Sequence, residues 1–146
     1  MQTIFKLFAE LTTYELYILL QLRSEVFVVE QNCVYQDIDD ADLKGIHQLI
    51  LKDEELIAYA RILPPGSYFS QLSIGRIVTA PQLRRSGLGH RLMQEAIGYC
   101  QVHFPNQSIK LSAQQYLIKF YESHQFFAQG EGYLEDGIPH IAMYRK

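Results

Sequence analysis

The sequence has no tryptophan, two cysteines and five prolines, and acidic residues only slightly outnumber basic ones. Cys33 and Cys100 lack the spacing of metal ligands or a redox pair, and two thiols are typical of a reducing cytosol. The net charge of −3, with scattered basic residues, argues against nucleic-acid binding. No apolar run is as long as a membrane span, and residues 1–6 lack signal-peptide features. We therefore expect a cytoplasmic protein that binds no metal, nucleic acid or membrane.

The length of 146 residues, with 48% hydrophobic content, is enough to bury a core, and no linker or repeat divides the chain. We expect one domain over residues 1–146. The apolar spacing predicts strands at 3–8, 46–51, 56–63, 72–79, 108–113, 127–133 and 138–145, and helices at 13–29, 87–103 and 115–123. This order predicts an α/β (mixed α+β) fold, with a central mixed sheet and helices on both faces.

The most informative motif is the run Arg-Arg-Ser-Gly-Leu-Gly from Arg84 to Gly89. An apolar strand precedes it, Pro81 ends that strand, and a helical pattern follows. This order directs free backbone N–H groups and the positive end of a helix toward an anion. Glycine lets the backbone approach phosphate closely, and the arginines add charged contacts. The run therefore predicts a pyrophosphate-binding turn.

Two other phosphate motifs do not fit this turn. A dinucleotide fingerprint needs a third glycine where Leu92 stands, and a P-loop needs Lys and Ser or Thr where His90 and Arg91 stand. The remaining pattern, R-x-x-G-x-G, resembles the acyl-coenzyme A motif of the GCN5-related N-acetyltransferases (GNAT). The alternative is an ordinary strand-to-helix turn with two surface arginines.

A second motif lies downstream, where the strand 109–113 leads to Gln114 and, seven residues later, to Tyr121. This is similar to a GNAT signature in which a strand leads to Asn and then to Tyr. In that family the Tyr lies beside the coenzyme sulfur and often acts as general acid, since a phenol can protonate a departing thiolate. The sequence departs from the signature at Gln114 and at Gln125, where the family has glycine. The alternative for Tyr121 is a core aromatic on an amphipathic helix.

The resemblance covers nearly the whole chain and is greatest to the ElaA-type branch of the family. The segments that carry it are 22–31, Tyr35, Asp39-Asp40, His47, 74–78 and 136–141. It implies the GNAT fold, with a splayed sheet, and transfer of an acetyl group from acetyl-CoA to a primary amine of a small molecule or peptide. It assigns coenzyme binding to Val78, Thr79, Arg84, Arg85, Ser86, Gly87, Leu88, Gly89, His90, Gln114 and Tyr121.

The general base is not assigned by the resemblance. Many family members carry a Glu on the strand before the turn, but residues 72–80 contain no acid. Glu30, His47 and His140 are the candidates, and water is a further one. Each candidate has a structural alternative, as a solvated carboxylate or a hydrogen-bonded histidine.

Charged residues near the first helix allow two interpretations each. The acids Asp37, Asp39, Asp40 and Asp42 form either an acidic rim that attracts a cationic amine or a solvated loop. The arginines Arg23, Arg61 and Arg76 interrupt apolar elements, and we expect ion pairs there in preference to contacts with a ligand carboxylate.

Two rival functions remain. A non-catalytic acyl-CoA sensor or partner-docking module of the same fold is supported by the missing strand Glu and by the changes at Gln114 and Gln125. An acyl-homoserine-lactone synthase is disfavoured by the strong glycine turn and the absence of tryptophan. The exposed final strands are compatible with either a monomer or a homodimer.

Overall fold

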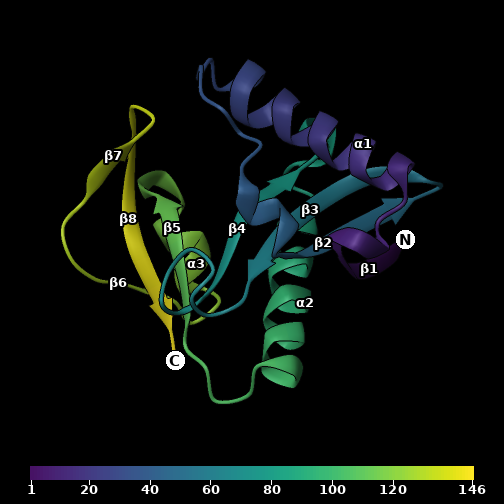
Figure 1. Cartoon of the computed structure of the whole chain (residues 1–146). Coiled ribbons are helices and arrows are strands. Elements are labelled where there is room, and N and C mark those ends of the chain that lie inside the picture. Colours follow the sequence, from purple (N-terminus) through teal and green to yellow (C-terminus); the bar gives the residue numbers. More distant parts are fainter.

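A mixed sheet of eight strands forms the centre of the computed structural model, which describes residues 1–146 (Figure 1). Its strand order is β1-β2-β3-β4-β5-β8-β6, and β7 pairs with β8. The strands are β1 (Gln2–Leu7), β2 (Ile46–Lys52), β3 (Glu55–Leu63), β4 (Leu72–Thr79), β5 (Ile109–Gln114), β6 (Phe127–Ala128), β7 (Tyr133–Glu135) and β8 (Ile138–Arg145). The predicted fold class is confirmed.

Three α-helices accompany the sheet: α1 (Thr13–Arg23), α2 (Leu88–His103) and α3 (Ile118–Glu122). A π-helical segment, η2 (Ser24–Glu30), continues α1. Single 3₁₀ turns are η1 (Phe8–Glu10), η3 (Asp40–Leu43), η4 (Pro81–Leu83) and η5 (Gln115–Leu117). None of the helices combines the length and apolar character that a bilayer crossing requires.

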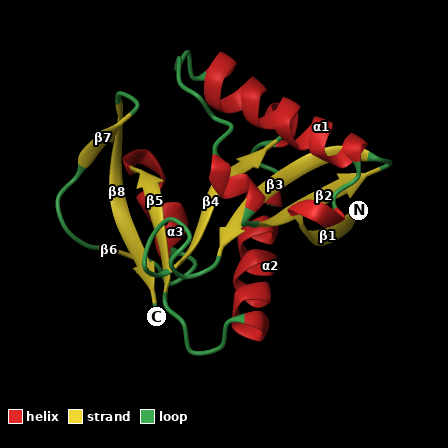
Figure 2. Cartoon of the chain, in the orientation of Figure 1, coloured by secondary structure: helices red, strands yellow, loops and turns green.

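The helices cover both faces of the sheet, as Figures 1 and 2 show. Alternation along the central strand β3 explains why, since successive side chains point to opposite faces. Ala60 and Ile62 pack in one core cluster with Leu92 of α2. Tyr59 packs in a second cluster with Leu19 of α1. The strand is therefore buried on both sides.

The first helix begins as predicted but ends differently. Thr12 Oγ1 accepts a hydrogen bond from Glu15 N at 3.0 Å, and Glu15 Oε1 accepts one from Thr12 N at 2.9 Å, which completes a capping box. We predicted one helix to residue 29. Instead the α-helix ends at Arg23 and a wider π-helical turn follows to Glu30.

The predicted strand 127–133 is wrong as a single element. It is divided into β6 and β7 because Gly130 has φ +87°, a left-handed conformation that interrupts strand geometry. The turn between β7 and β8 consists of Asp136 (φ 50°) and Gly137 (φ 78°). Positive φ at both central residues is the requirement of a type I′ hairpin turn.

The sheet splays between β4 and β5, as the family resemblance implied. Their parallel ladder is limited to residues 72–73 and 109–110, and Figure 1 shows the strands diverging beyond it. On its other side β4 contains a bulge, where Arg76 and Ile77 stand opposite Ala60. A bulge bends its strand and increases the twist, so it directs β4 away from β5.

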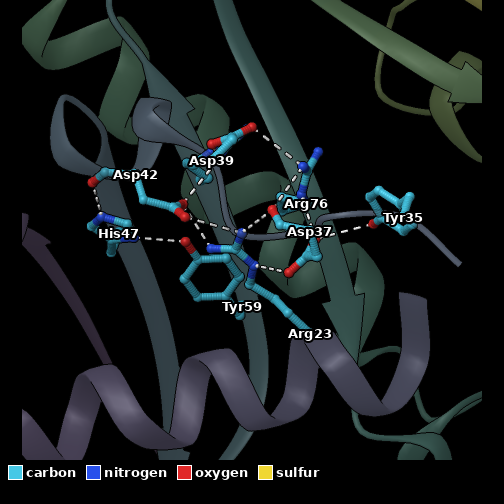
Figure 3. Close-up of polar contacts among 9 residues, drawn as sticks. Arg23, Tyr35, Asp37, Asp39, Asp42, His47, Tyr59 and Arg76 are labelled. Atoms are coloured by element: carbon cyan, nitrogen blue, oxygen red, sulfur yellow. Dashed lines mark hydrogen bonds and ion pairs between the residues drawn. The ribbon is translucent and has the colours of Figure 1, made fainter. Parts of the chain in front are cut away.

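A buried cluster of ion pairs holds this bulge (Figure 3). It joins Arg23 of α1, Arg61 of β3 and Arg76 of β4 to Asp37, Asp39 and Asp42 of the segment before β2. Arg23 is 0% exposed and donates from Nε to Asp37 at 2.9 Å and from Nη1 to Asp42 at 2.7 Å. Arg76, the bulge residue, has φ 51° and donates from Nε to Asp37 at 2.7 Å. The three arginines are therefore ion-pair partners, as we expected.

The aspartates of the cluster stay ionised because the arginines balance their charge. Burial alone would raise the pKa of the Asp42 carboxyl, but the hydrogen bonds and charges of Arg23 and Arg61 outweigh it and lower that pKa. A buried charge without such a partner carries a large desolvation cost. Removal of any one member would therefore leave a buried charge without its partner.

We predict that Arg23→Met destabilises the protein by about 3–5 kcal/mol, because it leaves buried carboxylates without a partner. Urea unfolding followed by circular dichroism measures the change. The matched control is Arg91→Met, since Arg91 pairs with Glu95 one helical turn away on the exposed face of α2. The control should cost less than about 0.5 kcal/mol. Equal losses for the two variants would contradict the assigned role of the cluster.

Candidate active site

A cleft of about 400 Å³ lies where β4 and β5 diverge. The β4 side contributes Ser73, Ile74, Gly75, Arg76 and Ile77, and the opposite side contributes Ser112, Gln114, Ile138 and His140. Half of the lining residues are hydrophobic. A concave site that combines apolar walls with polar groups is suited to a small-molecule ligand.

The cleft is lined from both faces of the sheet. Along β5, Ala113 belongs to the core beneath α2, so Gln114 and Ser112 point to the opposite face. His140 of β8 lies directly opposite Gln114 in the ladder and shares its face. Tyr121 approaches from the other face, on α3. Two reactants could therefore meet in this gap from opposite sides of the sheet.

Tyr121 belongs to the core and also lines the cleft, so its position is compatible with both of the alternatives that the sequence allowed. Its ring is 5% exposed and packs in the core, with its centroid 5.1 Å from that of Phe120 and 6.1 Å from that of Phe126. Its hydroxyl makes no hydrogen bond within the chain, yet it is not sealed from solvent and the residue lines the cleft. Burial raises the pKa of this phenol, so it carries its proton at neutral pH.

The predicted pyrophosphate turn has the expected backbone. Arg85 has φ 65° and Gly87 has φ 86°, and a Cβ built on Gly87 meets no atom within 4 Å. The N–H groups of residues 85–87 donate to no backbone carbonyl, and those of the first turn of α2 have no partner in the helix. Left-handed residues in such a turn direct N–H groups into a concave anion site. The turn therefore fits a phosphate ligand.

The turn adjoins α3, because a Cβ on Gly89 would lie 3.6 Å from the Phe120 ring. His90 follows, with Nδ1 2.9 Å from Nε2 of His124 at the end of α3. Burial, together with the charge of His90, lowers the pKa of His124. The predicted coenzyme residues of the turn thus lie beside the helix that carries Tyr121.

Two other predicted coenzyme residues lie on β4. Val78 packs its side chain against α1, in the cluster of Leu19, and Thr79 pairs with Ala58 of β3. Because the β4–β5 ladder ends at residue 73, the edge of β4 at these residues has no strand partner on the β5 side. This unpaired edge is available to a ligand in the gap.

Arg84 is paired in this structure. Its Nη1 and Nη2 atoms donate to Glu30 at 2.9 Å and 2.5 Å, which joins the turn to the end of η2. The hydrogen bond from Arg84 lowers the pKa of Glu30. A carboxylate with a lowered pKa is a weaker proton acceptor, so this contact disfavours Glu30 as general base.

His47 does not reach the cleft. It is 0% exposed, with Nε2 2.8 Å from the Asp42 carbonyl and Nδ1 2.6 Å from the Tyr59 hydroxyl. The carbonyl accepts only from Nε2–H, so Nδ1 accepts from Tyr59 and the ring is neutral. Burial also lowers the pKa of His47, which favours the same neutral form. Its contacts are those of a hydrogen-bonded structural histidine.

His140, in contrast, lines the cleft, and it contacts Glu135, a residue that the sequence motifs did not single out: Nε2 of His140 lies 3.4 Å from Oε2 of Glu135 on β7. Asp136, in the turn between β7 and β8, lines the same cleft. Cys33 donates from Sγ to the Asp136 carbonyl at 3.4 Å, which ties this hairpin to the segment after η2. Side chains two residues apart on a strand share a face, so the prediction of Gln114 could have been extended to Ser112. No sequence signal places Glu135 beside His140.

Comparisons with known proteins agree with this geometry. A family model described as an acetyltransferase (GNAT) domain matches residues 14–146. Protein ElaA of Escherichia coli (strain K12) is 47% identical over 140 residues, which cover 94% of this chain and 92% of ElaA. The crystal structure of an acyl-CoA N-acyltransferase from Pseudomonas aeruginosa has a TM-score of 0.95 at 44% identity, covering 100% of both chains. That of Escherichia coli ElaA has a TM-score of 0.94 at 44% identity, covering 99% of both.

The chain therefore belongs to the GNAT family, whose fold binds acyl-CoA and supports acyl transfer. Within that family it is a homologue of the ElaA proteins.

Proposed function

We propose that residues 1–146 form a single catalytic domain that transfers an acetyl group from acetyl-CoA to a primary amine of a small molecule or peptide. The observation that carries this proposal is the Tyr121 hydroxyl, which is protonated, unpaired and open to the cleft between β4 and β5. A proton donor at that point suits a reaction in which a thiolate departs.

The proposed roles follow from position. The N–H groups of residues 85–90 bind the pyrophosphate, and the unpaired edge of β4 at Val78 and Thr79 positions the pantetheine arm. Gln114 lies at the end of β5, on the cleft wall. Direct attack by an amine held in the same cleft needs no covalent enzyme intermediate, because proximity supplies much of the acceleration.

A non-catalytic acyl-CoA sensor is the alternative of a different class. The absence of an acid on β4 and the Gln114 substitution support it. Thiol release that depends on both an amine and Tyr121 separates the two functions.

We predict that Tyr121→Phe lowers kcat about 10²-fold or more, because the departing sulfur loses its proton donor. Acetyl-CoA affinity should stay within about twofold, since the phenyl ring and its packing remain. Thiol release and calorimetric titration measure the two quantities. The control is Tyr116→Phe, whose side chain is exposed on η5 and does not line the cleft. Unchanged turnover in Tyr121→Phe would remove Tyr121 from the acid role.

We predict that Gly87→Val abolishes acetyl-CoA binding, because its side chain fills the open space that the turn presents to a phosphate. The matched control is Gly130→Val. Gly130 also has φ near 87° and open space around its Cα, so the variant carries the same backbone strain away from the turn. Calorimetric titration should detect binding in the control alone. Normal affinity in Gly87→Val would contradict the turn assignment.

We predict that Glu30→Gln strengthens acetyl-CoA binding about two- to fivefold. Arg84 can then contact phosphate without first breaking its ion pair with Glu30. The kcat should not change, since the lowered pKa of Glu30 makes it a poor base. Arg84→Ala should weaken binding in the same titration. A fall in kcat of about 10²-fold for Glu30→Gln would instead identify Glu30 as the general base.

A further inference from the structure

The charges that line the cleft do not cancel. The acids before β2 do not form a free rim, because Asp37, Asp39 and Asp42 are paired with the arginines of the buried cluster. Three positive and three negative charges leave that cluster neutral. Glu135 and Asp136 line the cleft on the opposite wall without an arginine or lysine partner. The cleft therefore keeps an uncompensated negative wall on the β7–β8 hairpin.

A buried histidine faces this wall with an open acceptor atom. His140 is 6% exposed, and its Nδ1 lies 2.7 Å from the Ile138 carbonyl. The carbonyl can only accept, so Nδ1 carries a proton, and in the neutral form of the ring Nε2 is the atom with the lone pair. Nε2 lies 3.4 Å from Oε2 of Glu135. Nε2 in the neutral ring and Oε2 are both hydrogen-bond acceptors. Neither can satisfy the other, so both need a proton or an N–H donor between them.

The surroundings hold both groups in this orientation. Ser112 lies within reach of Oε1 of Glu135 at 3.4 Å and contacts the Tyr133 hydroxyl at 2.5 Å. The Tyr133 ring is stacked near the His140 ring, at an interplanar angle of 21°. The Glu135 side chain is 44% exposed, whereas His140 is inside the cleft. The pair thus connects the interior of the cleft with solvent.

We propose that Glu135 and His140 form the acceptor site, in which Glu135 binds the ammonium form of the acceptor and His140 Nε2 takes its proton. This inference rests on the proposed acetyltransferase function and assigns the base that the missing acid on β4 leaves open. Asp136 adds to the attraction of a cation.

The proton balance is complete with the groups present. The ammonium gives one proton to His140 Nε2, which passes it to solvent past Glu135. The neutral amine nitrogen then attacks the thioester carbonyl, so that the C–N bond forms and the C–S bond breaks. Sulfur leaves with the electron pair and takes a proton from Tyr121. The amide nitrogen loses its second proton, which restores the Tyr121 phenol.

The rest of the lining indicates the class of acceptor. Tyr68, Phe69, Tyr35 and Phe27 give the cleft aromatic and apolar walls. The charges of Arg61 and Arg76 are balanced by Asp37, Asp39 and Asp42, so these arginines offer no net positive charge to a ligand carboxylate. The preferred acceptor is therefore a primary amine on an apolar body, with no carboxylate beside the amine.

The probe for this class is 2-phenylethylamine, assayed by thiol release at saturating acetyl-CoA. The matched compound is phenylalanine, which adds only a carboxylate beside the same amine. We expect kcat/KM for phenylalanine to be at least about tenfold lower, because its carboxylate meets the negative wall. No turnover of 2-phenylethylamine by protein that binds acetyl-CoA, or a preference for phenylalanine, would overturn the acceptor class. Failure to bind acetyl-CoA would instead overturn the proposed function.

Two variants separate the roles of the pair. Glu135→Gln should raise KM for 2-phenylethylamine about tenfold with a smaller change in kcat, because it removes the charge that binds the ammonium. His140→Gln should lower kcat about 10²-fold, because the proton acceptor is lost. Neither should change acetyl-CoA affinity. The control is Glu131→Gln, a carboxylate on the exposed segment between β6 and β7 that does not line the cleft.

The pH profile distinguishes a base from a structural histidine. Glu135 and Tyr133 of β7 contact His140. The other charged and titratable groups that line the cleft are Asp136, Tyr121, Asp39, Arg61, Arg76, Cys33, Tyr35 and Tyr68. The kcat/KM of the wild type should fall on the acid side, because a general base acts only in its unprotonated form. This fall should persist in Glu135→Gln and Tyr121→Phe and disappear in His140→Gln. Persistence in His140→Gln, or unchanged kcat, would overturn the role of His140.

Discussion

The buried cluster of three arginines and three aspartates is the interaction on which the site geometry depends. It connects α1, the segment before β2 and strands β3 and β4 through paired charges that carry a high cost if separated. One of its members, Arg76, is also the bulge residue with positive φ. The bulge turns β4 away from β5, and the divergence of these strands creates the cleft. A network of surface ion pairs would not hold a strained residue in this way, because such pairs contribute little.

The sequence predicted most elements because they depend on local rules. Alternation identified the strands, the Thr12–Glu15 capping box marked the start of α1, and the glycine turn marked the start of α2. The errors lie where local rules are insufficient. The π-helical continuation of α1 has the same apolar spacing as an α-helix, and the strand at 127–133 is interrupted by glycine geometry that the apolar pattern does not report.

The site was predicted in part for the same reason. Tyr121 and the glycine turn belong to short local motifs, so the family resemblance could point to both from the sequence. The partners of Arg23, Arg61 and Arg76 are far away along the chain and could not be chosen among four nearby aspartates. The contact between Glu135 and His140 depends on a tight hairpin turn, and its place on the cleft wall depends on the pairing of β8 with β5. Both are properties of the folded sheet.

The distribution of charge links the scaffold to the proposed chemistry. Asp37, Asp39 and Asp42 are neutralised in the cluster that shapes the cleft, and the cleft-lining acids without an arginine or lysine partner, Glu135 and Asp136, are on the hairpin across the gap. Cys33 ties that hairpin to the segment that also carries Asp37, so the two walls are joined at one end of the cleft. An amine drawn to the hairpin would approach from the face of His140, while Tyr121 lies on the face of α3. In the proposed reaction the first proton of the ammonium leaves through His140 toward solvent past Glu135, and only the second proton, lost after attack, restores the Tyr121 phenol.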